Sequence, residues 1–413
     1  MNTLFDRDCW REIILTLEKN PLRTILTAFG VFWGVFMLVL LLGGGQGLKT
    51  GALHDFQDFA TNSLFVWPER TTIPYKGLPR NREYSFTTDD AAAIKDLVKG
   101  IKHLVPQVRR AASMTRGTQK GNYTVTGTFP EINLIEPVDI ALGRFINQID
   151  MEQKRKIAVI GKNVHLALFK GDENPIDQYI RISGAEYQVV GVFNSRHEGG
   201  WGDWQNGLVF MPLPTMQQAF NLGNRIGFFA IEAQAGIVVT MIGKEIKSML
   251  KERHRIAPED SLAIGENNVE NEYLKLSYLF AGISALIWVI GIGTLLSGII
   301  GVSNIMLFTV KARTHEIGIR RVLGATPMAV ITQILMESLL LTSTAGIFGL
   351  ALGILVLSRL YGIEAPTFRH PDISMAAALS SLGIIIVSGL AAGLLPAYRA
   401  VSLKPIEAIR DIT

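Results

Sequence analysis

Four long stretches without Asp, Glu, Lys or Arg constrain the fold of this 413-residue chain most strongly. A helix needs about 20 mostly apolar residues to cross a hydrocarbon core of about 30 Å. The stretches are Thr24–Leu48, Leu276–Val310, Ser338–Ser358 and Ile373–Tyr398, of 25, 35, 21 and 26 residues. Buried helices of soluble proteins fit shorter apolar runs of about 10–14 residues. We therefore expect four transmembrane helices, with the lipid bilayer as a partner.

Composition excludes several other classes. Only 18% of the residues are charged, against about 25% in soluble domains. The single cysteine, Cys9, cannot form an intramolecular disulfide. A net charge of +4 over this length is too weak to indicate nucleic-acid binding. We therefore expect a membrane protein with no nucleic-acid partner.

The first apolar run is interpreted as an uncleaved anchor, because a charged 23-residue segment precedes it and no A-x-A site follows. Within that segment, apolar residues recur at the spacing of one helix face: Trp10, Ile13, Ile14 and Leu17. This pattern predicts an amphipathic helix in the membrane interface over residues 1–22.

Basic residues set the orientation of the spans. Eleven of them lie before the first run, between the second and third, and after the fourth, against two in the loop 359–372. Both termini are therefore expected in the cytoplasm. The predicted segments are 1–22 (interfacial helix), 23–48 (first span), 49–275 (extracytoplasmic domain), 276–310 (second span with a stalk), 311–327 (cytoplasmic loop), 328–358 (third span), 359–372 (external loop), 373–398 (fourth span) and 399–413 (cytoplasmic tail).

The extracytoplasmic domain contains short strand-like runs as well as segments with the apolar spacing of a helix. It is therefore expected to be α+β. Short β-branched or aromatic runs predict strands, at Leu64–Trp67, Ile157–Gly161, Tyr179–Ile182, Tyr187–Phe193, Leu208–Met211 and Phe228–Ile231. A capping-box pattern opens a predicted helix over Thr87–Gly100, and helical spacing recurs over Ile237–Arg253. The middle is richest in strands, so we expect a β-rich subdomain (116–224) inserted into an outer one (49–115 and 225–275).

Small residues four apart let helix backbones approach closely. The pairs in the apolar runs are Gly30/Gly34, Ser297/Gly301, Gly349/Gly353 and Gly389/Gly393. They predict helix packing without naming the partner helix.

No catalytic constellation emerges from the sequence. A phosphate-binding G-x-x-x-x-G-K-[ST] motif does not occur, and the seven histidines are scattered without an H-E-x-x-H pair. We interpret Gly43–Gly45 as a flexible exit of the first helix. Glu337 lies close to the start of the third span, and its role stays open between a functional intramembrane carboxylate and an interfacial one. No cofactor, metal or enzymatic activity is expected of this chain itself.

The most distinctive motifs lie in the cytoplasmic segments and in the adjoining ends of the spans. They are Asn20–Thr24, Gly301–Met306, Ala312–Pro327, Gly393–Ala400 and Lys404–Arg410, joined outside the membrane by Gly143–Phe145, Ile157–Gly161 and Tyr187–Val192. Together these segments resemble the MacB/FtsX-like permeases of ABC transporters, the type VII or mechanotransmission group. The resemblance covers essentially the whole chain, in the form of a stand-alone permease without a fused ATPase domain.

The resemblance implies a permease dimer with two ATPase subunits, which bind ATP and Mg²⁺, docked beneath it. It also implies a porter-like outer part and a β-rich insert in the external domain. The loop between the second and third spans would be the coupling helix that contacts the ATPase, through Arg313, Glu316, Ile317, Gly318, Ile319, Arg320, Arg321, Leu323 and Gly324. Its arginines would offer charge to the partner and its Ile and Leu residues an apolar face.

Within the family, we expect efflux of antimicrobial or toxic compounds, with a periplasmic adaptor and an outer-membrane channel as further partners. Lipoprotein release and regulation of cell-wall hydrolases are the alternatives. From another class, the chain would be a membrane-anchored ligand sensor. That class needs a cytoplasmic output domain, and the longest cytoplasmic segment expected here has 23 residues.

Overall fold

A computed structural model describes residues 21–57, 60–170, 173–197, 199–360, 371 and 375–402. Contacts divide the chain into two compact units, which are treated separately below: residues 1–52 with 278–413, and residues 53–277. The predicted interfacial helix lies almost wholly outside the described residues. So do most of the loop 359–372 and most of the tail 399–413.

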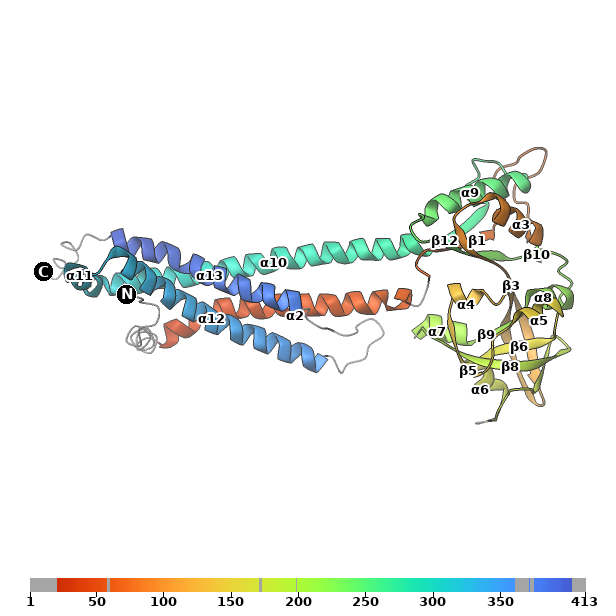
Figure 1. Cartoon of the computed structure of the whole chain (residues 1–413), viewed down its shortest axis with the longest axis horizontal. Helices are drawn as coiled ribbons and strands as arrows, with labels where there is room; N and C mark the ends of the chain where they lie inside the picture. Colours follow the sequence, from red (N-terminus) through yellow and green to blue (C-terminus); the bar gives the residue numbers. More distant parts are fainter. Residues whose placement is uncertain are drawn as a thin grey trace. The chain divides into compact units, whose positions relative to one another are not determined.

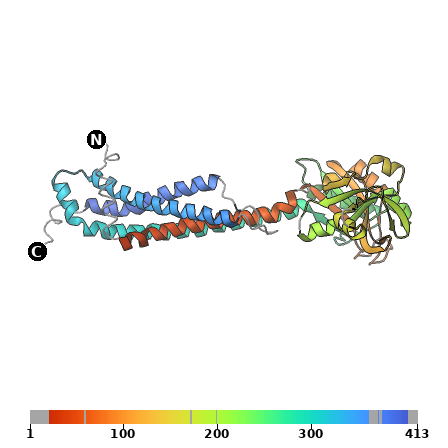
Figure 2. The same cartoon turned by 90° about the horizontal axis from the view of Figure 1, so that it is seen from below.

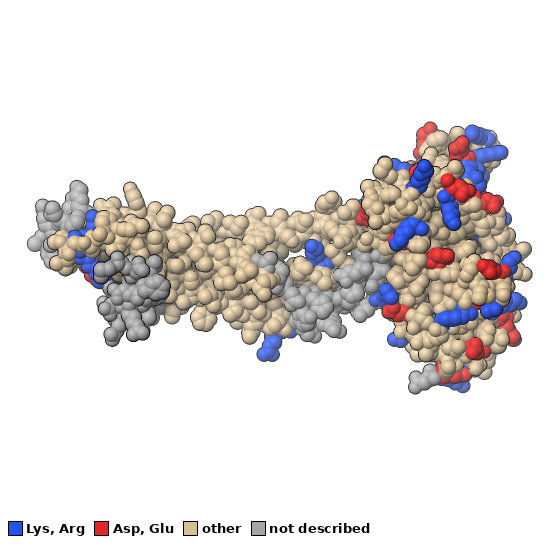
Figure 3. Space-filling model, in the orientation of Figure 1, with Lys and Arg blue, Asp and Glu red and all other residues tan. Residues whose placement is uncertain are grey.

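Four helices of the described chain are long and apolar enough to cross a membrane, as predicted. They are α2 (Pro21–Gln57), α10 (Val269–Ala312), α12 (Pro327–Leu360) and α13 (Met375–Ser402), and the short α11 (Thr314–Val322) joins α10 to α12. In Figures 1 and 2 the four long helices run side by side, with α11 at one end. On the face shown in Figure 3 they display few charged side chains, whereas the other unit displays many of both signs.

Helix α10 is longer than its apolar run. Its 44 residues correspond to about 66 Å at 1.5 Å per residue, roughly twice the hydrocarbon thickness. Asn268 caps its start by accepting a hydrogen bond from the Asn271 amide at 3.0 Å. Glu270 and Glu272 lie in the first turn, where the helix dipole favours acidic residues.

The glycine run at the end of the first span is helical rather than a flexible exit. Helix α2 continues through it to Gln57. A Cβ at Gly43 would clash with the Leu357 side chain, and one at Gly45 would lie 3.0 Å from Ile287 Cδ1. Close packing against α12 and α10 thus explains two of these glycines without any flexibility.

The second unit is built on one large sheet. Its strand order is β12-β1-β11-β3-β4-β9-β6-β8-β5, with β7 pairing β3 and β8; β10 and β2 form a separate pair. The β4–β9 and β6–β8 pairs are parallel and the other pairs are antiparallel. The strands are β1 (Ser63–Pro68), β2 (Phe86–Thr87), β3 (Ile101–Arg116), β4 (Gln119–Thr128), β5 (Val138–Gly143), β6 (Ile157–Gly161), β7 (Tyr179–Ile182), β8 (Ala185–Ser195), β9 (Leu208–Pro212), β10 (Arg225–Ile226), β11 (Phe228–Ala233) and β12 (Ile264–Asn268).

Seven helices accompany these strands in the described part of the second unit, before α10 begins. They are α3 (Thr88–Leu97), α4 (Ile132–Ile135), α5 (Gln148–Glu152), α6 (Lys162–Leu168), α7 (Gly199–Asn206), α8 (Leu213–Ala219) and α9 (Val239–Arg253). The predicted helices over Thr87–Gly100 and Ile237–Arg253 correspond to α3 and α9, and the Thr87–Asp90 capping box is formed.

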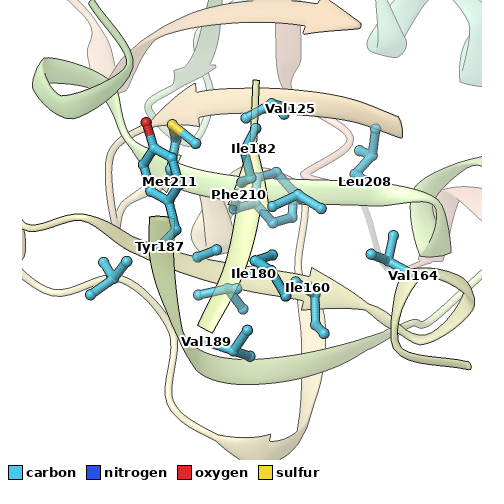
Figure 4. Packing of buried hydrophobic residues seen from close by; sticks show 14 of the residues in the cluster. Val125, Ile160, Val164, Ile180, Ile182, Tyr187, Val189, Leu208, Phe210 and Met211 are labelled. Carbon is cyan, nitrogen blue, oxygen red and sulfur yellow. The ribbon is translucent and has the colours of Figure 1, made fainter. Parts of the chain in front are cut away.

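Buried side chains form two large clusters in this unit. One lies between residues 108 and 216 and includes Ile160, Tyr187 and Phe210 (Figure 4). The other packs α3 and α9 against one face of β1 and β11, through residues such as Leu64, Phe229 and Ile246. The long strand β3 runs through both regions of the sheet, so the division into an outer part and an insert stays a prediction.

Asp90 ties α3 to the end of α9. Its carboxylate accepts hydrogen bonds from Arg253 Nε at 2.7 Å and the Thr87 amide at 2.9 Å, and it lies 2.8 Å from His254 Nε2. Burial raises the pKa of Asp90, but the hydrogen bonds from His254 and Arg253 outweigh it and hold that pKa well below its usual range.

We expect the second unit to lose stability below about pH 4. The folded pKa of Asp90 lies below its unfolded value of about 3.9, so its stabilisation is present above that pH and is lost as the pH falls. Asp90→Asn should lower the free energy of unfolding at pH 7 by about 1–3 kcal/mol and reduce this acid dependence. Thermal unfolding of the full chain in detergent measures both; identical pH profiles for the two proteins would contradict the assignment.

Candidate coupling helix

Local sequence signals define both ends of α11. Leu323 caps the helix, and Gly324 follows with a φ of 100°. The Ala325 amide donates to Arg320 O at 3.0 Å and the Gly324 amide to Arg321 O at 3.2 Å, which is the Schellman pattern. Only glycine adopts that φ without strain, so Gly324 fixes where α11 stops.

Helix α12 begins only three residues after Gly324. The Thr326 hydroxyl accepts a hydrogen bond from the Ala329 amide at 3.3 Å, and Pro327 occupies the first helical position. The link from α11 to α12 is therefore short and fixed at both sides.

The exposed surface of α11 is apolar at its C-terminal end. Ile319 is 41% exposed, Val322 61% and Leu323 81%. These three residues have the i, i+3, i+4 spacing of one helix face. Met328, in the first turn of α12, is 68% exposed. We call Ile319, Val322, Leu323 and Met328 the apolar tip.

Two of the arginines predicted to offer charge to a partner, Arg320 and Arg321, also make hydrogen bonds within the chain. Arg320 Nη2 donates to Glu316 at 3.0 Å and Arg320 Nη1 to Gln333 of α12 at 3.2 Å. Arg321 Nη1 donates to the Val401 carbonyl of α13 at 2.8 Å. These contacts fasten α11 to two membrane helices, so the arginines position the helix.

Glu337 belongs to this arrangement. Its carboxylate is 6% exposed and lies 3.7 Å from Arg313 Nη1. Arg313, at the start of α11, also lies 3.9 Å from Glu316. A buried carboxylate is costly without a positive partner, and the Arg313–Glu337 pair thus ties the start of α11 to the side of α12.

The remaining predicted coupling residues face inward. Ile317 packs against the core of the four-helix unit, and Gly318 is buried. A small cavity of about 30 Å³ lies beside them, lined by Arg313, Arg320 and Glu337 among others. Val322 and Met328 were missed by sequence reasoning, although the 319/322/323 spacing is a signal that could have found Val322.

The predicted packing glycines occupy three helix contacts. A Cβ at Gly30 would lie 3.4 Å from Gly298 Cα, and one at Gly34 3.4 Å from Leu295 Cδ2, both on α10. Gly349 and Gly353 face Phe32 and Val39 of α2, and Gly389 and Gly393 face Thr342 and Ser338 of α12. Ser297 is exposed and a Cβ at Gly301 would meet nothing within 4 Å, but both residues line a groove together with Gly30 and Gly34 of α2.

Gly349→Val should separate α2 from α12. A Cβ there would lie 2.5 Å from the Phe32 carbonyl oxygen and 3.2 Å from the Phe36 amide nitrogen, and backbone atoms cannot swing aside. We expect a loss of about 1–3 kcal/mol of stability, measured by thermal unfolding of the full chain in detergent. Gly383→Ala, at a site with nothing within 4 Å, is the control; equal losses in both variants would contradict this packing.

Comparison with known proteins places these features in a family. Residues 24–249 match the family model of the MacB-like periplasmic core domain, and residues 276–405 match that of the FtsX-like permease C-terminal domain. The chain belongs to the MacB/FtsX-like ABC transporter permeases. The permease is accordingly an inner-membrane protein whose second unit is a periplasmic domain.

Two curated relatives illustrate the match. The pyoverdine export ATP-binding/permease protein PvdT of Pseudomonas putida is 28% identical over 403 residues, covering 94% of this chain and 57% of the relative. The macrolide export ATP-binding/permease protein MacB of Rhodospirillum rubrum is 28% identical over 396 residues, covering 95% and 59%. The permease thus spans less than two thirds of the length of these relatives.

A solved structure, the periplasmic region of MacB from Actinobacillus actinomycetemcomitans, is 18% identical. The aligned region covers 55% of this chain and 97% of the chain in that structure, with a TM-score of 0.44.

Proposed function

We propose that the permease converts ATP hydrolysis in nucleotide-binding domains outside residues 1–413 into movement of its periplasmic domain. The observation that carries the proposal is the apolar tip, which α11 presents while its arginines fasten the same helix to α12 and α13. An exposed apolar cluster on a rigid support is typical of a protein docking site. Helix α10 runs unbroken from the periplasmic domain to within two residues of α11.

In this proposal the chain is not itself catalytic. ATP and Mg²⁺ bind the partner ATPase, whose closure moves α11 and, through it, α10. Two permease chains and two ATPase subunits form the working unit, with both permease termini in the cytoplasm. The basic residues that flank the spans support this orientation.

For the substrate, we propose efflux of antimicrobial or toxic compounds from the periplasmic side. The names of both relatives, which describe export of pyoverdine and of macrolides, support export over lipoprotein release. A periplasmic adaptor and an outer-membrane channel would complete the pathway.

Co-purification tests the proposal. The full chain would be expressed with the ATPase encoded beside its gene, extracted in detergent and reconstituted into nanodiscs. We expect a stable complex with two copies of each subunit and a changed rate of ATP hydrolysis. Absence of any complex with such an ATPase would overturn the proposal and favour a ligand sensor.

A further inference from the structure

One face of the sheet in the periplasmic domain carries an open cavity of about 690 Å³. That volume lies within the range of small-molecule sites. Four aromatic side chains line the cavity: Phe65, Trp67, Trp201 and Phe228. A cavity of this size and lining can enclose a small amphipathic molecule.

Strand register explains why three of these side chains, Phe65, Trp67 and Phe228, lie on one face. Phe65 pairs with Ala230 and with Asn267, while Phe228 pairs with Gln107. Residues directly opposite in an antiparallel ladder share a face, and residues two apart on a strand share it as well. The other face is covered by α3 and α9, so the cavity occupies the face that these helices leave open.

An ion pair between the partly exposed Arg109 and the buried Glu136 also lines the cavity. Arg109 of β3 lies 3.8 Å from Glu136, which follows α4. The Arg109 guanidinium is 4.4 Å from the centre of the Phe228 ring and 4.9 Å from that of Trp204. These rings and Glu136 hold the cation in place.

The Glu136 carboxylate has unused hydrogen-bonding capacity. The residue is 8% exposed, and its carboxylate makes no hydrogen bond within the part of the chain that the structure describes. On the same face Gln107 is fully buried, and neither polar atom of its side chain has a partner among those residues. Buried polar groups are nearly always hydrogen-bonded in native proteins, and the Glu136 carboxylate, which lines the cavity, can accept a hydrogen bond from a molecule bound there.

The charges indicate the sign of that group. Glu272 of α10 also lines the cavity, which therefore holds two carboxylates and one guanidinium. Aromatic rings attract cations through their faces, and a carboxylate binds an ammonium by a charge-assisted hydrogen bond.

We propose that this cavity binds a lipophilic amine in its protonated form. The ammonium group would donate to Glu136, and the apolar body would lie against Phe65, Trp67, Trp201 and Phe228. As a site for exported substrate this rests on the proposed function, but binding itself needs no ATPase.

Titration calorimetry on the full chain in nanodiscs, without nucleotide, measures binding to this cavity. The heat measured with empty nanodiscs is subtracted. The probes are 2-(1-naphthyl)ethylamine, the neutral 2-(1-naphthyl)ethanol and the anionic 3-(1-naphthyl)propanoate. We expect the amine to bind at least about tenfold more tightly than the other two. Equal affinities, or tighter binding of the anion, would overturn the proposal, whereas ATPase coupling would stand in either case.

Variants locate the site. Glu136→Gln should weaken amine binding by about 10- to 100-fold while leaving binding of the alcohol nearly unchanged. Trp201 is half-exposed, so Trp201→Ala should leave the fold intact. It should weaken binding of both the amine and the alcohol. Glu245→Gln, an exposed carboxylate on α9, is the matched control. Unchanged amine binding in both cavity variants would place the ligand elsewhere and overturn the proposal.

Discussion

Leu323→Asp is expected to uncouple the permease from its ATPase. Leu323 is 81% exposed at the end of α11, and burying its side chain against a partner contributes about 1.5–3 kcal/mol. A carboxylate there would have to be desolvated on docking. We therefore expect the affinity for the ATPase to fall at least about tenfold, measured by pull-down at graded ATPase concentrations and by ATP hydrolysis in nanodiscs.

The permease fold itself should survive this change, because the Leu323 side chain is largely in solvent. Leu97→Asp, at an exposed leucine of the periplasmic domain that is 64% exposed, adds the same charge far from α11 in sequence and serves as the control. If Leu323→Asp binds and stimulates the ATPase as the unmodified chain does, the apolar tip is not the docking surface.

Glu337→Gln should loosen α11 rather than remove its docking surface. The change leaves Arg313 without its buried carboxylate at 3.7 Å. Arg313 can still turn toward Glu316, so we expect a loss of stability of about 1–3 kcal/mol. The ATPase should still bind, but stimulation of its activity by the permease should fall, because a loosely held helix transmits less movement.

A double-mutant cycle separates the pair from its surroundings. Arg313→Gln and Glu337→Gln should each cost stability, and the double variant should cost less than their sum. Glu316→Gln, which removes a half-exposed carboxylate, should change stability by less than about 1 kcal/mol. Additive effects of the Arg313 and Glu337 changes would mean that the two residues do not act as a pair.

The four spans and several strands were predictable because their signals are local. A charge-free run of 20 or more residues is seldom found in a soluble protein. The strands predicted at Ile157–Gly161 and Tyr179–Ile182 coincide with β6 and β7. Strands β3 and β4 were missed. They carry many polar residues, such as Gln107 and Arg109. They pair with each other as a hairpin, but their other edges pair with the distant strands β11 and β9.

The sequence predicted a helix between the second and third spans, where α11 lies, but not the contacts that its arginines make within the chain. The motif located α11, yet sequence could not show whether Arg320 and Arg321 face a partner or their own chain. Their partners, Gln333 and the Val401 carbonyl, lie 13 and 80 residues away. Long-range pairing of this kind follows from the packing of α11 against α12 and α13, which no local pattern encodes.

Hydrogen exchange of the permease–ATPase complex tests most directly whether ATP in one subunit moves the periplasmic domain of the other. The complex in nanodiscs would be compared without nucleotide and with a trapped ATP analogue. We predict altered exchange in α11 and in the periplasmic domain, and no such change when the permease carries Leu323→Asp. Changes confined to the ATPase, with the periplasmic domain identical in both states, would contradict mechanical coupling through this chain.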